Sequence, residues 1–187
     1  MDYLYRNTKM KCILLMGIFF VCISFNLHAQ VLSNTGAVFS VNSGTSISSL
    51  NTINNNTGTI SNNGTINTGN LINAATFSGN GFLNLSGNFI NSGTFTAGTG
   101  TVNFNGTTSQ TISPLTFNDL TISNITAACL ATGNLTVNNN FTTLGNSILD
   151  MTAYSLTVNL INHSGILKTQ NTSVNPFTPG KIWSGTV

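Results

Sequence analysis

Charged side chains are scarce in this sequence. Of its 187 residues, five are Lys or Arg and three are Asp or Glu. Beyond residue 30 only two bases and two acids remain, namely Lys168, Lys181, Asp119 and Asp150. A nucleic-acid surface needs clustered Lys or Arg to neutralise phosphates, so nucleic-acid binding is excluded. A polybasic membrane-binding patch is excluded for the same reason.

Cysteine is equally scarce. Cys12 and Cys22 lie in an apolar N-terminal segment, which leaves Cys129 alone in the rest of the chain. A single cysteine cannot form an intrachain disulfide, even in an oxidising exterior. We expect Cys129 to act as a small buried hydrophobic side chain.

The first 29 residues have the organisation of a signal peptide. Three basic residues precede an apolar run over residues 13–25, and Ala29 supplies the small residue at the cleavage point. The run is shorter than the roughly 20 apolar residues that a membrane span needs. We therefore expect cleavage after Ala29, a secreted or outer-cell-surface location, and no membrane contact after cleavage.

Apolar residues recur at a nearly fixed spacing between Gly58 and Asn105. The steps between successive large apolar residues are 6, 5, 6, 6, 6, 6 and 7 positions. An amphipathic helix would repeat at about three and four, and the intervening Gly, Asn and Thr are poor helix formers. The pattern predicts short strands centred on Ile60, Ile66, Leu71, Phe77, Leu83, Phe89, Phe95 and Val102.

One such strand cannot bury its apolar side chain alone, so we expect the strands to stack as successive coils. Stacking aligns the apolar side chains in inner columns, with Thr and Asn pointing outward and Gly or Asn at the corners. Asn side chains at equivalent corners can then hydrogen-bond along the stack, as amide ladders do in cross-β structures.

The second half of the chain keeps this chemistry with longer turns. Three similar strands of the form polar-Leu-Thr-Ile/Val begin at Asp119, Asn134 and Ser155, which are 15 and 21 positions apart. A coil of roughly 20 residues with three faces is the usual size for a parallel β-helix. The sequence therefore predicts an all-β fold, a single-stranded parallel β-helix of about seven coils at ~4.8 Å each.

Several stretches resemble a known group of repeats. Gly100–Ile112 reads GTVNFNGTTSQTI and Leu115–Asn124 reads LTFNDLTISN, and both resemble repeats of large secreted bacterial surface proteins that use type IX secretion. Asn134–Asn159 resembles the NLTV and YSLTV coils of the same proteins. The resemblance implies a right-handed parallel β-helix, related to filamentous-haemagglutinin and pectin-lyase-like folds, in an adhesin-like protein. The C-terminal sorting domain of such proteins is not seen in this sequence.

A left-handed hexapeptide β-helix is the alternative form of solenoid. The six-residue rhythm from Ile60 to Phe95 resembles it, and small residues such as Gly64 and Gly81 follow four positions after an apolar one in part of the repeat. The five- and seven-residue steps and the loss of rhythm after Gly106 favour the right-handed form.

The ends of the solenoid differ from its middle. Residues 30–56 lack the Gly rhythm, so we expect an N-terminal cap or a first irregular coil there, followed by solenoid repeats over residues 57–187. The last segment, Lys181–Val187, reads like the start of another coil rather than a cap. We expect a truncated product, a gene fragment, or a protein whose last coil stacks against a partner.

The residues that carry chemistry are few and scattered. β-Helix enzymes that cleave polysaccharides use clustered acids, often with calcium, and a basic residue. Asp119 and Asp150 lie 31 positions apart, and we expect each to be a solvated turn acid. His163 has no nearby acid or cysteine in sequence, so we expect a polar turn residue. The sequence therefore predicts no catalytic residue, no metal site and no cofactor, in a protein that is not an enzyme.

The remaining functions are structural or binding roles. A scaffold or adhesin-like role ranks first, with cell-surface glycans or other coils of a longer solenoid as partners. A glycan-binding module ranks second, with Tyr154 and Trp183 as candidate stacking platforms. Ice binding ranks third, because pairs such as Thr94-x-Thr96 do not continue along the sequence from coil to coil. A polysaccharide-degrading enzyme ranks last.

We expect residues 30–187, expressed alone, to form a β-rich monomer that melts cooperatively. Far-ultraviolet circular dichroism and sedimentation velocity measure both properties. A disordered or polymerising chain would mean that further coils are required, because an open strand edge recruits other strands.

Overall fold

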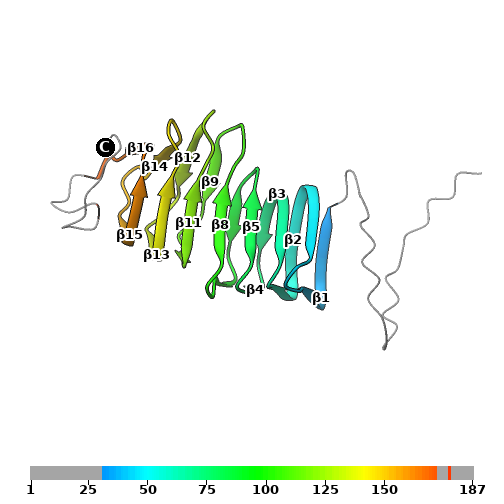
Figure 1. The fold of residues 1–187 in the computed structure, drawn as a ribbon. Helices are drawn as coiled ribbons and strands as arrows, with labels where there is room; N and C mark the ends of the chain where they lie inside the picture. Colours follow the sequence, from blue (N-terminus) through cyan, green and yellow to red (C-terminus); the bar gives the residue numbers. More distant parts are fainter. Residues whose placement is uncertain (1–30, 172–176, 178–187) are drawn as a thin grey trace, which may run out of the picture.

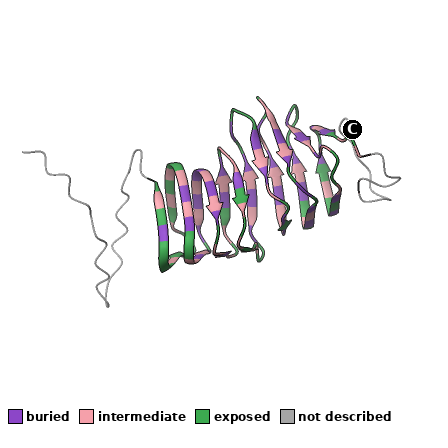
Figure 2. Cartoon of the chain, turned by 180° about the vertical axis from the view of Figure 1, so that it is seen from behind, coloured by how far each residue is buried: buried purple, intermediate pink, exposed green. Residues whose placement is uncertain are grey.

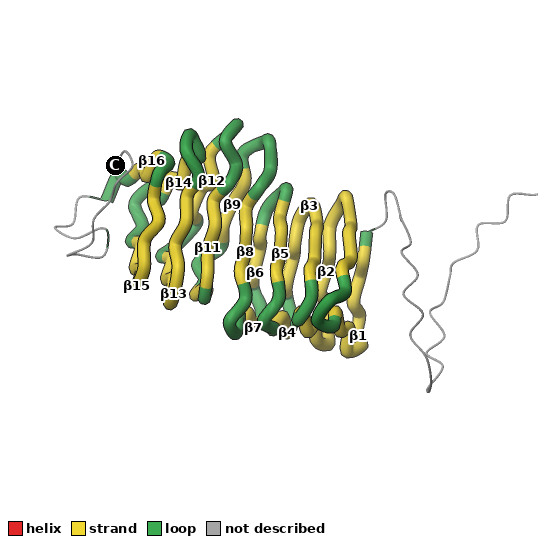
Figure 3. Tube along the Cα trace, in the orientation of Figure 1, coloured by secondary structure: helices red, strands yellow, loops and turns green. Residues whose placement is uncertain are grey.

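The computed structural model describes residues 31–171 and Phe177, which form a stack of coils (Figure 1). Sixteen strands join into one sheet that winds round the stack, and all the strand pairs are parallel. The described residues contain no helix, and therefore none that could span a membrane (Figure 3). The predicted all-β parallel solenoid is confirmed, and its right-handedness stays a prediction.

Each coil passes through three faces, which we call A, B and C in the order in which the chain enters them. Five long strands bend round corners and so contribute to more than one face: β1 (Leu32–Val41), β2 (Ser46–Asn62), β3 (Thr65–Asn73), β13 (Leu135–Thr143) and β15 (Leu156–His163). The remaining strands of face A are β6 (Phe89–Asn91), β9 (Gln110–Ile112), β12 (Ala128–Ala131), β14 (Ile148–Asp150) and β16 (Ile166–Lys168). Those of face B are β4 (Thr76–Ser78), β7 (Thr94–Thr96) and β10 (Thr116–Phe117). Those of face C are β5 (Phe82–Leu85), β8 (Thr101–Phe104) and β11 (Asp119–Ile122).

The coil length agrees with the prediction of about 20 residues. Paired residues on successive coils are separated by as few as 17 positions, from Ile60 to Phe77, and by as many as 23, from Phe89 to Ile112. The chain crosses face A eight times, through β1, β2, β3, β6, β9, β12, β14 and β16, which makes seven steps from coil to coil.

The N-terminal coil is paired like the others but less regularly. Leu32–Val41 pairs with residues 53–62 of β2, and the register shifts between Asn34 and Thr35 and again before Val38. The apolar side chains of Leu32, Phe39 and Ile47 are only partly buried there. The boundary predicted at residues 56/57 falls inside β2, where the chain passes from face A to face B.

The apolar rhythm read from the sequence is the inner lining of the solenoid. Its eight residues occupy faces B, C and A in turn, and all are buried except Phe95, which is partly buried. Figure 2 shows buried and more exposed positions alternating along the strands of every coil. On face B the rings of Phe77, Phe95 and Phe117 follow one another with centroids 5.8 Å apart at each step and with their planes tilted. Phe89 meets Phe95 edge-on at 5.0 Å, the arrangement that ring quadrupoles favour.

An amide ladder runs through the corner between faces A and B, as predicted. The Nδ2 groups of Asn34, Asn55 and Asn73 donate to the Oδ1 atoms of Asn55, Asn73 and Asn91, at 2.9, 2.6 and 2.7 Å. The expectation that Asn side chains point outward is wrong here, because Asn55 and Asn73 are fully buried. Main-chain carbonyls at a corner cannot all bond to a neighbouring strand, so they need other donors. The buried Asn side chains supply them, and Asn73 Nδ2 also donates to the carbonyl of Thr94 at 3.0 Å.

We expect Asn73→Ala to lower the free energy of unfolding by about 2–3 kcal/mol, because it leaves buried partners on both sides without a hydrogen bond. Asn56→Ala is the matched control, since Asn56 is exposed and bonds only at the surface, to Ser33. Urea denaturation measures both values. Equal losses in the two variants would contradict a structural role for the ladder.

Candidate functional site

The two acids are not brought together. Asp119 lies on face C, where its Oδ1 accepts hydrogen bonds from Asn139 Nδ2 at 2.9 Å and from the Asn140 amide at 2.8 Å. Asp150 lies on face A and accepts a bond from the Thr152 amide at 2.8 Å. Both carboxylates hold corners of the coil. Among the residues that the structure describes, no three His, Cys, Asp or Glu side chains gather as metal ligands.

His163 is not a turn residue at the surface, as the sequence suggested, but an inward side chain that is 1% exposed. It continues the inner column of face C below Thr143, and its ring stacks on Phe141 with centroids 6.3 Å apart. Thr143 Oγ1 lies 2.7 Å from His163 Nδ1. The same oxygen accepts bonds from the amides of Ser164 and Gly165, so its own proton is available to donate to Nδ1.

Cys129 is fully buried, as predicted. Burial raises the pKa of its thiol to about 12, which keeps the sulfur protonated and unreactive at neutral pH. Its Sγ lies 3.7 Å from Oε1 of Gln110, a fully buried amide that also donates to the carbonyls of Leu85 and Gly87. Cys129 therefore belongs to the packing of the corner between faces C and A.

Of the two predicted stacking platforms, Tyr154 and Trp183, the structure describes Tyr154 alone. Tyr154 is 38% exposed in the turn between β14 and β15, where its amide donates to the carbonyl of Met151. Trp183 lies outside the described residues. Tyr154 alone offers one ring at a corner near the C-terminal end of the described coils.

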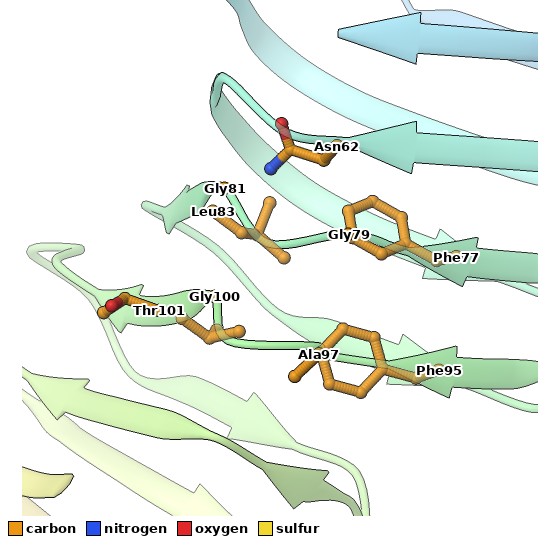
Figure 4. Close-up of a pocket in the computed structure, with 10 residues that line it drawn as sticks. Asn62, Phe77, Gly79, Gly81, Leu83, Phe95, Ala97, Gly100 and Thr101 are labelled. Atoms are coloured by element: carbon orange, nitrogen blue, oxygen red, sulfur yellow. The ribbon is translucent and has the colours of Figure 1, made fainter. Parts of the chain in front are cut away.

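A small cavity lies inside the corner between faces B and C (Figure 4). Its volume is about 10 Å³, and Phe77, Leu83 and Phe95 contribute to its lining. The coils meet tightly here, because a Cβ on Gly79 would overlap the carbonyl oxygen of Asn62. This volume is near the least that can hold one water molecule, so the cavity is a packing feature and too small for an organic ligand.

Face B carries a row of threonines that the linear sequence does not make obvious. Outward threonines recur on face B, and the register aligns them in two sets of three: Thr59, Thr76 and Thr94 on β2, β4 and β7, and Thr116, Thr136 and Thr157 on β10, β13 and β15. The row is neutral and half-exposed to exposed throughout. Its hydroxyls form the most regular set of polar groups on the outer surface of the described coils.

The strand ladder of face B is broken in the middle of this row. β7 pairs with β4 and β10 pairs with β13, but β7 and β10 are not paired with each other. The adjoining step on face A retains one residue pair, Phe89 with Ile112, whereas face C keeps all four pairs between β8 and β11. The two coils therefore remain joined by strand pairing along face C, whereas along face B their strands are not paired.

The break has a local cause in the sequence. Four residues, Ala97–Gly100, separate β7 from β8, but Asn118 alone separates β10 from β11. Pro114 precedes β10 and has no N–H to donate to the coil above.

A cleft of about 410 Å³ opens at the break. It spans three successive coils at the corner between faces A and B. The first coil contributes Asn91, Thr94 and Phe95, the middle coil Pro114 and Thr116, and the third coil Asn134 and Thr136. None of these side chains is charged. We call this surface the break cleft.

A second hollow, of about 190 Å³, lies on face C between Ser48 and Asn105. The Asn67 and Asn84 amides there are already engaged, because Asn84 Nδ2 donates to Asn67 Oδ1 at 2.9 Å and Asn103 Nδ2 donates to Asn84 Oδ1 at 3.2 Å. A ligand there would have to displace bonds between coils, so the break cleft is the stronger candidate.

The strand pairing and the neutral outer faces define the class of this protein, a parallel β-solenoid. The sequence matches no protein-family model, and neither a curated protein nor a solved structure is significantly similar to it. Fold and site therefore rest on the geometry described above.

We expect Thr143→Val to lower the free energy of unfolding by about 2–3 kcal/mol, because two amides and the His163 ring lose a buried partner. Thr142→Val is the control on the same strand, with an outward side chain, and should cost less than about 0.5 kcal/mol. Urea midpoints at neutral pH compare the two. Similar midpoints would show that the Thr143 hydroxyl is not holding the last coils together.

Proposed function

We propose that this chain is a non-catalytic structural module of a secreted or cell-surface bacterial protein, with an adhesin-like role. The observation that carries the proposal is the unbranched stack of coils, in which strand pairing ties each coil to the next and the Asn ladder links the first four crossings of face A. Such a stack is a stiff spacer, since bending it would separate hydrogen-bonded strands on one side.

The outer surface suits many weak contacts. Rows such as the threonines of face B repeat the same hydrogen-bonding group at each coil. A repeating ligand can engage several of these groups at once, so weak individual contacts add up to lasting attachment. Cell-surface glycans and other coils of a longer solenoid are the partners that fit this chemistry.

Secretion is supported by the organisation of residues 1–29, which lie outside the described residues, and by the resemblance to type IX surface proteins. The near-absence of charge in the rest of the chain also has a consequence for binding. Attachment through neutral hydroxyls and amides should depend little on ionic strength, unlike attachment through ion pairs.

The test is to produce the full chain in a Gram-negative host and then to coat beads with the exported protein. We expect an exported species that begins at Gln30 by mass spectrometry, and bead adhesion to bacterial or host cells that changes little as salt is added. Beads coated with the same protein after thermal unfolding are the control.

Retention of the uncleaved chain in the cytoplasm would overturn the secreted role. Adhesion no greater than that of unfolded protein would overturn the adhesin-like role. Release of new reducing ends from polysaccharides by the protein would overturn the non-catalytic assignment.

A further inference from the structure

We propose that the break cleft is a binding site for a neutral carbohydrate. The inference deepens the proposed adhesin-like function and rests on it, since a glycan site is what an adhesin needs. It concerns a different surface from that of Tyr154, one of the two residues that the sequence singled out; the other, Trp183, lies outside the described residues.

Most polar side chains of the cleft are available to a ligand, whereas the Asn91 amide is used within the fold, where it accepts from Asn73 Nδ2 and donates to the Gly93 carbonyl. The hydroxyls of Thr94, Thr116 and Thr136 take part in no hydrogen bond within the described residues, and all three line the cleft. Asn134 uses its Oδ1 to accept a bond from the Ser155 amide at 3.0 Å, which leaves its Nδ2 free to donate. Each hydroxyl can both donate and accept, as sugar hydroxyls also do.

The cleft also offers apolar surface next to these hydroxyls. Phe95 is partly buried and lines the cleft, and the exposed Pro114 lies on the middle coil. Aromatic and proline rings pack against the C–H faces of a sugar ring while polar side chains bind its hydroxyls. The rings of Phe89 and Phe117 hold Phe95 in place, with centroids 5.0 and 5.8 Å away.

The absence of charge in the lining selects among ligands. None of the cleft's side chains could pair with a carboxylate, sulfate, phosphate or ammonium group. The charged side chains of the described coils lie elsewhere, Asp119 on face C and Asp150 and Lys168 on face A. A charged ligand would lose part of its hydration here without gaining an opposite charge, whereas a neutral ligand avoids that cost.

An added peptide strand fits the cleft less well than a sugar. A peptide strand that paired with the free edge of β7 would have to lie between β7 and β10, so the two strands would need to be two strand spacings apart. The Phe95 and Phe117 rings are nevertheless 5.8 Å apart, the same as the Phe77 and Phe95 rings of the paired strands β4 and β7. Residues of β7 and β10 also have Cα atoms within 8 Å of each other, so the two strands stand too close together to admit another strand between them. The volume of about 410 Å³ falls within the range of roughly 300–1,000 Å³ that small-molecule sites occupy.

The hollow also argues against a flat, ice-like contact on the threonine row. A lattice contact needs successive hydroxyls in one plane, but the row is interrupted by the cleft between Thr94 and Thr136.

The experiment titrates the purified full chain with neutral cello-, malto-, xylo- and manno-oligosaccharides, and with oligogalacturonate as a charged probe. Calorimetry gives the affinity, and saturation-transfer NMR identifies the bound sugar face. Thr116→Tyr fills the cleft, and Thr157→Tyr, on the same row beyond it, is the matched control. Thr94→Val removes one lining hydroxyl, with Thr76→Val as its control on the neighbouring paired strand.

We expect at least one neutral oligosaccharide to bind and oligogalacturonate not to bind. Thr116→Tyr should weaken binding about tenfold or more, and Thr94→Val about three- to tenfold, because each removes direct contacts. Both controls should stay within about twofold of the unmodified chain. Urea midpoints confirm that each variant is folded, and the near-isosteric Thr94→Val decides the matter if Thr116→Tyr is unstable.

Three results would overturn the proposal: no neutral probe binds, the charged probe binds instead, or both cleft variants bind as tightly as their controls. Bead adhesion and export, measured on the same preparations, separate this outcome from failure of the proposed function. Adhesion without oligosaccharide binding removes the cleft site and leaves the adhesin-like role. Cleft-dependent binding by a chain that is retained in the cytoplasm keeps the site and removes the secreted role.

Discussion

The parallel main-chain pairing between successive coils is the interaction on which the rest of this structure depends. Because each strand bonds to its equivalents one coil above and below, an inward residue in one coil forces its partner inward in the next. Apolar columns follow from this, as in the step from Phe77 to Phe95. The same alignment acts on polar residues, so that Asn55 and Asn73 meet inside the corner and satisfy one another.

The pairing also dictates where the surface can become a site. Along most of the stack the polar groups of one coil are used by the next, either in the main-chain ladder or in side-chain rows such as Asn67, Asn84 and Asn103. Where the corner before β11 shortens to Asn118, face B loses its pairing while face C keeps it. The polar side chains at that corner consequently face solvent with hydrogen-bonding capacity to spare. The binding site that we propose at this irregularity agrees with the general observation that functional sites break the rules of the surrounding fold.

The inner lining could be read from the sequence because it obeys a short period. Steps of five to seven residues identified Leu71, Phe77 and Leu83 as inward residues, and the structure places them on three successive faces, since one strand and one corner together take about that length. The role of Cys129 was equally accessible, because an isolated cysteine in an apolar stretch has few alternatives. The rows on the outside were harder. The outward threonines of face B lie 17 to 22 positions apart, and corner lengths that vary from coil to coil hide their recurrence.

The sequence by itself determined that this chain forms a parallel stack of three-faced coils with an apolar interior and a nearly uncharged exterior. Periodicity and composition carry that information, because they are properties of neighbouring residues. Only the tertiary structure decided which asparagines turn inward, why His163 is buried against Thr143, and where the ladder opens. Those outcomes depend on which residues of different coils lie at the same height, and that register is set by the summed lengths of the corners between them.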